Sequence, residues 1–369
     1  MEKLKVMHVV TTDKLSGAEK VVLDIESNLD KERFLPFALC KGGDLKDLYE
    51  NAGIKTYVAD LSSLNPREIK KLKAYLKESS IDILHAHDVK ASIAARIASK
   101  GLNIPVISHM HSSYPWLEGM SPLKYIDAFY RGSYKLSIAC SDMVKEHYLK
   151  YNKKISKDKI KVLNNSFNFN ELKGKSIIPK EKMRHKLNIK NDTYVFGFLG
   201  RLLDIKGVDL LINSFNEIYK KIPESMLVIV GDGSERERLE AMVKDYGLEK
   251  KVLFEGYQKD VYSYLNMFDT FILPSKLEGL PMAVLEAMAM KIPVISTPVA
   301  GVKNLIKDNY NGIILKTRDE KSLYEAMTKM YYLKDERNIM VENAYKYLFE
   351  NYNIDIYMNN LQNIYKNIV

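Results

Sequence analysis

The fold is decided by the stretch Phe271-Ile-Leu-Pro-Ser-Lys-Leu-Glu-Gly-Leu-Pro-Met-Ala-Val-Leu-Glu-Ala-Met-Ala-Met290. Its first residues are apolar and strand-like, Pro274-Ser275 ends the strand, and Pro281 suits the first position of a helix. The stretch therefore predicts a buried strand, a short loop and a helix. Open α/β sheets bind their ligands at this carboxyl end of the strands.

Two glutamates in this stretch, Glu278 and Glu286, are candidate ligand-binding residues. Glu278 precedes the helix, where free backbone amides favour anions and polar groups such as sugar hydroxyls. Glu286 is the single charged side chain between Met282 and Met290. It needs a hydrogen-bonding partner from the protein or from a ligand, because burying an unpaired charge costs roughly several kcal/mol. The alternative is a solvated Glu278 and a Glu286 paired within the core.

Composition indicates an ordinary folded protein large enough for two domains. The chain has 369 residues, of which 46% are hydrophobic and 28% charged. Its apolar runs are strand-length, so we expect no membrane span. Residues 1–10 read as a first strand and not as a signal peptide, which favours a cytoplasmic protein. The two cysteines, Cys40 and Cys140, suggest neither a disulfide framework nor a metal site.

The net charge of +9 is concentrated in the first half of the chain. Residues 1–170 hold 27 Lys and Arg against 20 Asp and Glu, a balance of +7. The densest cluster is 150–161, and Lys124, Arg131 and Lys135 lie among aromatic residues. Such patches attract phosphates or acidic lipid headgroups. The alternative is that they are only solvated surfaces.

Strand-like and helix-like segments alternate along most of the chain. Segments that read as strands are 4–10, 35–40, 55–59, 82–86, 105–108, 136–140 and 160–163, then 194–199, 226–230, 252–255, 269–273, 292–296 and 312–315. The polar stretch 164–192 interrupts the pattern. We therefore expect two doubly wound parallel α/β domains, residues 1–170 and 171–353. A final helix, within 354–369, is expected to pack back on the first domain.

Two loops after predicted strands of the second domain contain candidate functional motifs. Residues 198–207 end a strand at Gly200 and then present Arg201 and Lys206, two cations that suit an anionic diphosphate. The alternative is a short loop with surface cations. Residues 229–237 contain a Gly-x-Gly turn, which is a weak signal, and Ser234 with Glu237 predicts a capping box for the next helix.

The first domain offers a loop and four histidines. Ser16 or Gly17 is expected to begin a helix whose free amides suit a phosphate. His85 and His87 end one predicted strand, and His109 and His111 follow another. The His-x-His pairs lack carboxylates or thiols at familiar spacing, so a structural role is favoured over metal binding.

These features together resemble the GT-B glycosyltransferases, specifically the retaining family 4 (GT4). The resemblance rests on Glu-x7-Glu within 278–289, on the Gly-Arg and Lys-Gly pairs of 200–207, and on the two-domain layout, and it spans nearly the whole chain. It implies two Rossmann-like domains facing a central cleft, with the acceptor bound by the first and a nucleotide sugar by the second.

The resemblance also implies a role for each candidate residue. Glu286 would bind the ribose of the donor, while Glu278 and the amides of Gly279 and Leu280 would hold the transferred sugar. The diphosphate would meet Arg201 and Lys206 beside Gly200, and Gly17 would approach it from the first domain. His111 would lie near the reacting sugar.

The sequence thus predicts a transferase that moves a sugar from a UDP- or GDP-sugar to a glycan or lipid-linked acceptor with retention, in cell-surface or extracellular polysaccharide synthesis. We expect no metal, no other cofactor and no nucleic-acid partner. The charge also suits contact with an anionic membrane, such as the inner face of the cell membrane. The alternatives are a nucleotide-sugar epimerase of the same fold, an inactive GT-B partner subunit, and a basic nucleic-acid-binding protein.

Overall fold

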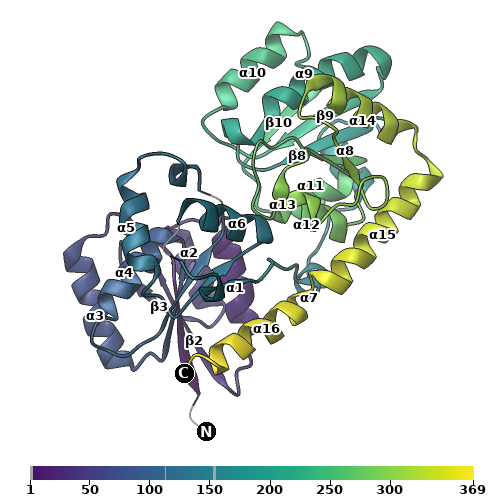
Figure 1. Cartoon of the computed structure of the whole chain (residues 1–369). Coiled ribbons are helices and arrows are strands. Elements are labelled where there is room, and N and C mark those ends of the chain that lie inside the picture. The colour runs from purple at the N-terminus through teal and green to yellow at the C-terminus, as the bar shows by residue number, and fades with distance from the viewer. Residues whose placement is uncertain (1–2, 113, 153–154) are drawn as a thin grey trace. The chain divides into compact units, whose positions relative to one another are not determined.

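The computed structural model describes residues 3–112, 114–152 and 155–369 (Figure 1). Ser113 of the histidine segment and Lys153 and Lys154 of the basic cluster lie outside the described residues. The chain divides into two compact units: unit 1 is Met1–Ser166 with Ile354–Val369, and unit 2 is Phe167–Asn353. Each unit is built around its own parallel sheet.

Unit 1 contains a seven-stranded sheet in the order β3-β2-β1-β4-β5-β6-β7. All of its strand pairs are parallel. The strands are β1 Leu4–Val9, β2 Phe34–Cys40, β3 Lys55–Val58, β4 Ile83–His87, β5 Val106–Met110, β6 Leu136–Ala139 and β7 Ile160–Val162. The helices are α1 Gly17–Asn28, α2 Gly43–Asn51, α3 Pro66–Ser79, α4 Val89–Ala98, α5 Pro122–Arg131, α6 Asp142–Tyr151 and α16 Ile354–Lys366.

Unit 2 contains a six-stranded parallel sheet in the order β10-β9-β8-β11-β12-β13. The strands are β8 Tyr194–Leu199, β9 Ser225–Val230, β10 Val252–Gly256, β11 Thr270–Leu273, β12 Val294–Ser296 and β13 Ile313–Ile314. The helices are α7 Phe169–Lys173, α8 Lys180–Lys186, α9 Val208–Lys221, α10 Arg236–Asp245, α11 Val261–Met267, α12 Met282–Ala289, α13 Ala300–Lys303, α14 Glu320–Tyr332 and α15 Asp335–Asn351.

Both sheets follow from short apolar runs that are covered on two faces. Every residue of β4, β5, β6 and β11 is buried. Parallel strands need such cover, because the helices that connect them lie on the sheet's faces. Each predicted strand segment has a counterpart in the structure, so the predicted pair of doubly wound parallel α/β domains is confirmed.

Strand order reverses once in each sheet, and the reversal places the candidate loops. In unit 1 the chain moves outward from β1 to β2 and β3, then returns to pair β4 with the other side of β1. In unit 2 the same reversal lies between β8 and β11. Ligands of doubly wound sheets bind at the carboxyl ends of the strands at such a point.

Three local predictions are wrong. Helix α10 begins at Arg236 with Glu235 at its N-cap and has no side-chain cap bond, so Ser234 and Glu237 do not form a capping box. Pro281 occupies the N-cap of α12 and not its first helical position. Arg131 is 1% exposed, pairs with buried Asp127 and donates to Ser108 Oγ at 2.7 Å, so it does not belong to a surface patch.

Among the described residues, no helix combines the length and the apolar character that a membrane crossing requires.

Glu26 of α1 carries a buried carboxyl group. It is 1% exposed, and neither of its carboxyl oxygens has a partner among the described residues. Burial raises the pKa of Glu26 well above its usual value. The folded protein therefore holds this group protonated at a pH where the unfolded chain has released the proton.

This difference makes stability depend on pH with a definite sign. Above the pKa of an unfolded glutamate, the folded state binds more protons than the unfolded state, so the free energy of unfolding falls as pH rises. We expect Glu26→Gln to raise the melting temperature at pH 8 by more than at pH 5, because an amide carries no proton to lose. Glu32→Gln, an exposed control four residues after the end of α1, should change little at either pH. Equal effects of Glu26→Gln at both pH values would contradict the assignment.

Candidate functional site

The candidate residues of unit 2 come together at the carboxyl edge of β8 and β11. Arg201 and Lys206 follow β8, and Glu278 follows β11. Lys206 Nζ lies 2.6 Å from Glu278 Oε1, and the two side chains are 20% and 9% exposed. Glu278 is therefore not the solvated loop residue of the alternative interpretation. An ammonium group has three N–H donors, so Lys206 can bind Glu278 and still donate to an anion.

A hydrogen-bond network holds Glu278 in place. Ser275 Oγ donates to Glu278 Oε1 at 2.6 Å, and Thr297 Oγ1 donates to the carbonyl oxygen of Ser275 at 2.6 Å. Ser275 and Thr297 are both fully buried. The carboxylate is thus oriented by the ends of β11 and β12 before any ligand binds, and such orientation reduces the entropy cost of binding. The sequence analysis did not identify either hydroxyl residue.

Two glycines allow the loops of this edge to pack closely. A Cβ atom on Gly207 would lie 2.4 Å from the carbonyl oxygen of Pro274. One on Gly301 would lie 2.1 Å from the carbonyl oxygen of Gly279. Any larger residue at either position would displace backbone, because real contacts are not this short. The glycine after Lys206 and the glycine of α13 therefore fix the positions of Lys206 and of the Glu278-Gly279 loop.

The Gly-x-Gly turn after β9 has a structural explanation. A Cβ atom on Gly231 would lie 1.9 Å from the carbonyl oxygen of Gly200, and one on Gly233 would lie 2.2 Å from that of Leu202. These glycines let the loop after β9 pack on the loop after β8. Gly200 and Arg201 are held by that packing, and Arg201 itself is exposed.

Helix α12 presents its amino end at the same edge. Gly279 and Leu280 precede the helix, and its N-cap, Pro281, makes no side-chain cap bond. The first amides of a helix without such a cap are available to an anion or a hydroxyl group. Glu286 lies within α12 and is 6% exposed, as its apolar sequence neighbours predict.

Three further charged residues lie at this edge and were not identified from the sequence. Lys276 Nζ lies 2.6 Å from Asp204 Oδ1, so a second and more exposed ion pair joins the two loops that Lys206 and Glu278 join. Arg318 donates from Nε to the carbonyl oxygen of Pro274 at 3.1 Å, while its buried Nη2 has no partner among the described residues. No local motif marks these residues.

In unit 1, Gly17 begins α1 directly after the loop that follows β1. Ser16 is the N-cap, and its hydroxyl donates to the carboxylate of Glu19 and accepts no hydrogen bond from a backbone amide of the helix. A Cβ atom at position 17 would meet no described atom within 4 Å. Packing within the described residues therefore gives no reason for glycine at this position.

The histidines of unit 1 lie deeper in the sheet than predicted. Strand β4 extends through His87 and β5 extends through Met110, so His109 is a strand residue and does not follow the strand. His8 of β1, which the sequence analysis did not identify, joins them. His111 directly follows β5 and is half-buried.

Ring nitrogens of these histidines approach one another closely. One nitrogen from each of His8, His85 and His87 lies within 4.8 Å of the others, and the same holds for His87, His109 and His111. Three imidazoles at such distances could hold a transition metal ion. Most of the nitrogens are, however, engaged in hydrogen bonds, for example 2.8 Å between His87 Nδ1 and His111 Nε2, and of these nitrogens only His109 Nε2 and His111 Nδ1 lack a partner among the described residues. A ring nitrogen that donates or accepts a hydrogen bond has no lone pair left for a metal.

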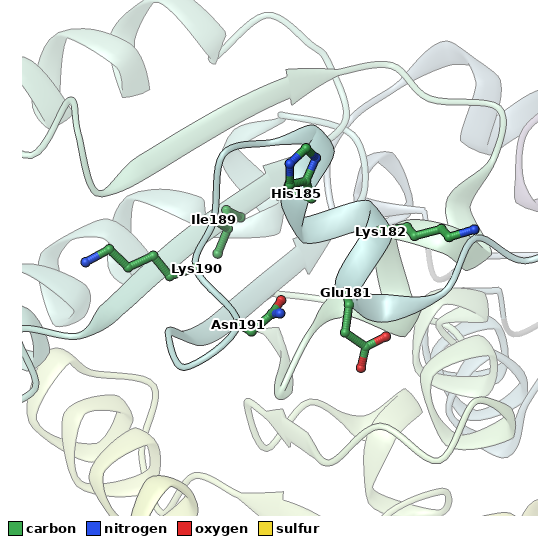
Figure 2. A pocket seen from close by; sticks show the side chains of 6 residues that line it. All are labelled: Glu181, Lys182, His185, Ile189, Lys190 and Asn191. Carbon is green, nitrogen blue, oxygen red and sulfur yellow. The ribbon is translucent and has the colours of Figure 1, made fainter.

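A surface hollow of unit 2 is separate from these groups. Figure 2 shows it beside α8, lined by Glu181, Lys182, His185, Ile189, Lys190 and Asn191. These residues precede β8, so the hollow lies toward the amino end of that strand and not at the edge that carries Arg201.

Comparisons with known proteins agree along the whole chain. The family described as "Glycosyl transferases group 1" matches residues 179–347, and "Glycosyltransferase Family 4" matches residues 15–171. An Escherichia coli UDP-Gal:alpha-D-GlcNAc-diphosphoundecaprenol alpha-1,3-galactosyltransferase is 27% identical, over 100% of this chain and 98% of its own. The Escherichia coli O-antigen biosynthesis glycosyltransferase WbnH is 28% identical, over 93% of this chain and 95% of its own.

Among solved structures, Anabaena HepE in complex with UDP and glucose is similar, with a TM-score of 0.88 at 21% identity. The match covers 98% of this chain and 99% of HepE, and it shows a shared GT-B fold. The two family matches account for the parallel-sheet units in turn, and the full-length relatives are glycosyltransferases. The chain belongs to the family 4 glycosyltransferases.

Proposed function

We propose that this glycosyltransferase moves a sugar from a nucleoside-diphosphate sugar to a glycan or lipid-linked acceptor with retention of the anomeric configuration, in the synthesis of a cell-surface polysaccharide. The names of the relatives support this proposal: one acts on a sugar joined to diphosphoundecaprenol and another serves O-antigen biosynthesis. The UDP bound to HepE supports uracil as the base of the donor nucleotide.

The observation that carries the proposal is the Lys206–Glu278 pair beside the free amino end of α12. Breaking a glycosyl phosphate bond leaves positive charge on the sugar and negative charge on the diphosphate. Fixed cations and helix amides at the phosphates lower this barrier. In the proposal Arg201 and Lys206 take the phosphate charge, while Glu278, Gly279 and Leu280 hold the sugar and Glu286 the ribose. These groups supply the stabilisation without a metal ion.

The proposal also gives roles to two residues of unit 1. Gly17 would let the diphosphate approach the start of α1, and the lack of any packing reason for glycine there supports this role. His111 would contact a hydroxyl group of the reacting sugar. Its Nδ1 atom is buried and has no partner among the described residues, so a hydrogen-bonding group of a ligand would satisfy it.

Nucleotide binding provides the first test of the donor. We expect UDP, among UDP, GDP, ADP and CMP, to raise the melting temperature of the wild-type protein. A ligand that binds only the folded state contributes about 2.7 kcal/mol at a hundredfold excess over its Kd. Glu286→Ala should abolish the shift, because the ribose hydroxyl groups lose their acceptor.

Glu240→Ala serves as the control in the same titration, because Glu240 is an exposed helix residue of α10. An unchanged shift in Glu286→Ala would reject the ribose assignment. With the matching UDP-sugar and acceptor, the product's glycosidic bond should have the donor's anomeric configuration by NMR, and an inverted product would reject retention. Release of an epimerised free nucleotide sugar would favour the epimerase alternative.

Lys206 and Lys276 form a matched pair for testing the phosphate role. Both join the loop after β8 to the loop after β11 through a 2.6 Å ion pair. We expect Lys206→Ala to lower kcat by about 100-fold or more, the usual loss on removing one preorganised electrostatic group. Lys276→Ala should stay within about threefold, because exposed ion pairs contribute little. Near-normal turnover in Lys206→Ala, or equal losses in both variants, would reject the role.

The outer face of α5 supports a proposal that unit 1 contacts an anionic membrane. Two large aromatic side chains are strongly exposed there, Tyr125 at 62% and Phe129 at 76%, and Met120, just before the helix, is 90% exposed. Tyr125 and Phe129 are four residues apart and so share one face of the helix. Exposed lysines follow in the same unit, namely Lys135, Lys150, Lys157, Lys159 and Lys161. Aromatic side chains beside cations are typical of surfaces that bind acidic lipids.

Vesicle sedimentation checks this contact. The wild-type protein should bind vesicles that contain acidic phospholipid and should be released by salt, because the attraction is electrostatic in part. The double variant Tyr125→Ala, Phe129→Ala should bind more weakly. Tyr257→Ala, which removes a 65% exposed tyrosine of unit 2, should bind like the wild type. Equal binding to acidic and neutral vesicles, or none to either, would contradict the proposal.

A further inference from the structure

The five clustered histidines of unit 1 share one face of the sheet. In a strand, residues two apart point to the same side, so His85 joins His87 and His109 joins His111. Strand register places His8 beside His85 and His87 beside His109. His8, His85, His87 and His109 are at most 1% exposed. Tyr365 of α16, also fully buried, covers this face.

Hydrogen bonds join three of the rings in a row that begins at His111. His111 Nε2 lies 2.8 Å from His87 Nδ1. His87 Nε2 in turn lies 2.8 Å from His8 Nδ1. Each bond uses one nitrogen of each ring, so the second nitrogen of His8 remains available.

Tyr365 joins this row to the other two rings. Its hydroxyl oxygen lies 3.2 Å from His8 Nε2 and 2.6 Å from His85 Nδ1. His85 Nε2 lies 3.2 Å from His109 Nδ1. The six side chains therefore form one unbranched chain in the order His111, His87, His8, Tyr365, His85, His109. Its end atoms, His111 Nδ1 and His109 Nε2, are buried and have no partner among the described residues.

All five rings are neutral at physiological pH. Burial lowers the pKa of His8 to about 3 and that of His111 to about 4. Burial and the neighbouring imidazoles also lower the pKa values of His85, His87 and His109 well below the usual value. A neutral imidazole has one N–H donor and one acceptor nitrogen.

Counting protons restricts the chain to two states. Five neutral rings and one hydroxyl group carry six protons, and the five hydrogen bonds use one proton each. The sixth proton must lie at one end, because if His8 and His85 both donated to Tyr365, the buried hydroxyl proton of Tyr365 would have no acceptor among the described residues. If it lies on His109 Nε2, every ring carries its proton on Nε2; if it lies on His111 Nδ1, every ring carries it on Nδ1. The five histidines therefore share one tautomer.

We propose that Tyr365, together with His8, His85, His87 and His109, acts as a set of positioning residues that fixes the tautomer of His111. The ligand at His111 Nδ1 is a hydroxyl group of a sugar, and this part rests on the role of His111 given under Proposed function. In the Nε2 state His111 accepts from that hydroxyl group, and in the Nδ1 state it donates to it.

The positioning matters because a sugar hydroxyl group can both donate and accept. A free imidazole in water samples both tautomers, whereas a ring at the end of this chain can change only when a proton enters at one end and leaves at the other. The hydroxyl group at His111 is therefore held in one hydrogen-bonding direction. Tyr365 of the C-terminal helix links this direction at His111 to the tautomers of His85 and His109.

The tautomers can be measured in the ligand-free, full-length protein. Two-bond ¹H–¹⁵N correlation spectra of ¹⁵N-histidine-labelled protein at pH 7.5 distinguish Nδ1–H, Nε2–H and charged rings. We expect all five clustered histidines to show the same neutral tautomer. His147→Gln and His185→Gln identify the signals of the two histidines outside the cluster. A mixture of tautomers among the five, a charged ring, or one equivalent of tightly bound zinc would overturn the proposal.

Tyr365→Phe divides the chain into segments of three and two rings while keeping the aromatic ring in the core. We expect the ring ¹⁵N signals of His111 to change in this variant, although Tyr365 is two hydrogen-bonded rings away. Tyr357→Phe is the matched control, because it removes a buried hydroxyl group of the same helix that has no partner among the described residues. Unchanged His111 signals in Tyr365→Phe, or equal changes in both variants, would overturn the proposal.

Measurements of turnover test the hydrogen-bonded chain and the proposed role of His111 separately. We expect Tyr365→Phe to lower kcat by about tenfold, which corresponds to about 1.4 kcal/mol, with donor affinity unchanged. Tyr357→Phe should retain wild-type kcat. Coupled tautomers with an unchanged kcat would reject the proposed role of His111 while the hydrogen-bonded chain stands. Uncoupled tautomers would reject the chain whatever the activity.

Discussion

Parallel pairing at the two reversal points is the constraint on which the rest of this protein depends. Parallel strands end at one edge of their sheet, so the loops after β8 and β11 must meet although they are far apart in sequence. That meeting brings the ammonium group of Lys206 to the carboxylate of Glu278. The corresponding pairing of β1 with β4 in unit 1 brings His8 beside His85.

Close packing of the loops at glycine residues then fixes the positions of the side chains that strand pairing brings together. Gly207 and Gly301 leave no room for a Cβ atom against the loops that follow β11. Gly231 does the same against the loop after β8. Gly17 is different, because a Cβ atom there would have no described atom within 4 Å. Close packing therefore explains Gly207, Gly231 and Gly301 but not Gly17.

Buried polar groups have different kinds of partner in the two units. In unit 2 the carboxylate of Glu278 is held by a cation and a hydroxyl group, so its charge is compensated locally. In unit 1 the histidines lie beside one another without carboxylates as partners, so burial leaves them neutral and their protons are shared along a chain. A hydroxyl group of the last helix completes that chain. The C-terminal residues therefore belong to the chemistry of the first sheet as well as to its packing.

Local sequence pattern was sufficient to predict the strands, the two-sheet architecture and the motif that contains Glu278 and Glu286. Apolar periodicity, turn residues and helix starts are properties of neighbouring residues in the chain. Local pattern was not sufficient to predict contacts across a sheet. The participation of His8 and the burial of Arg131 and Glu26 depend on strand order, on register and on which helix covers which face. Two-residue spacing of histidines in strands is a signal for a shared face, but only the folded sheet brings three strands and the last helix together. Their meeting is set by packing between distant segments, and no local propensity encodes it.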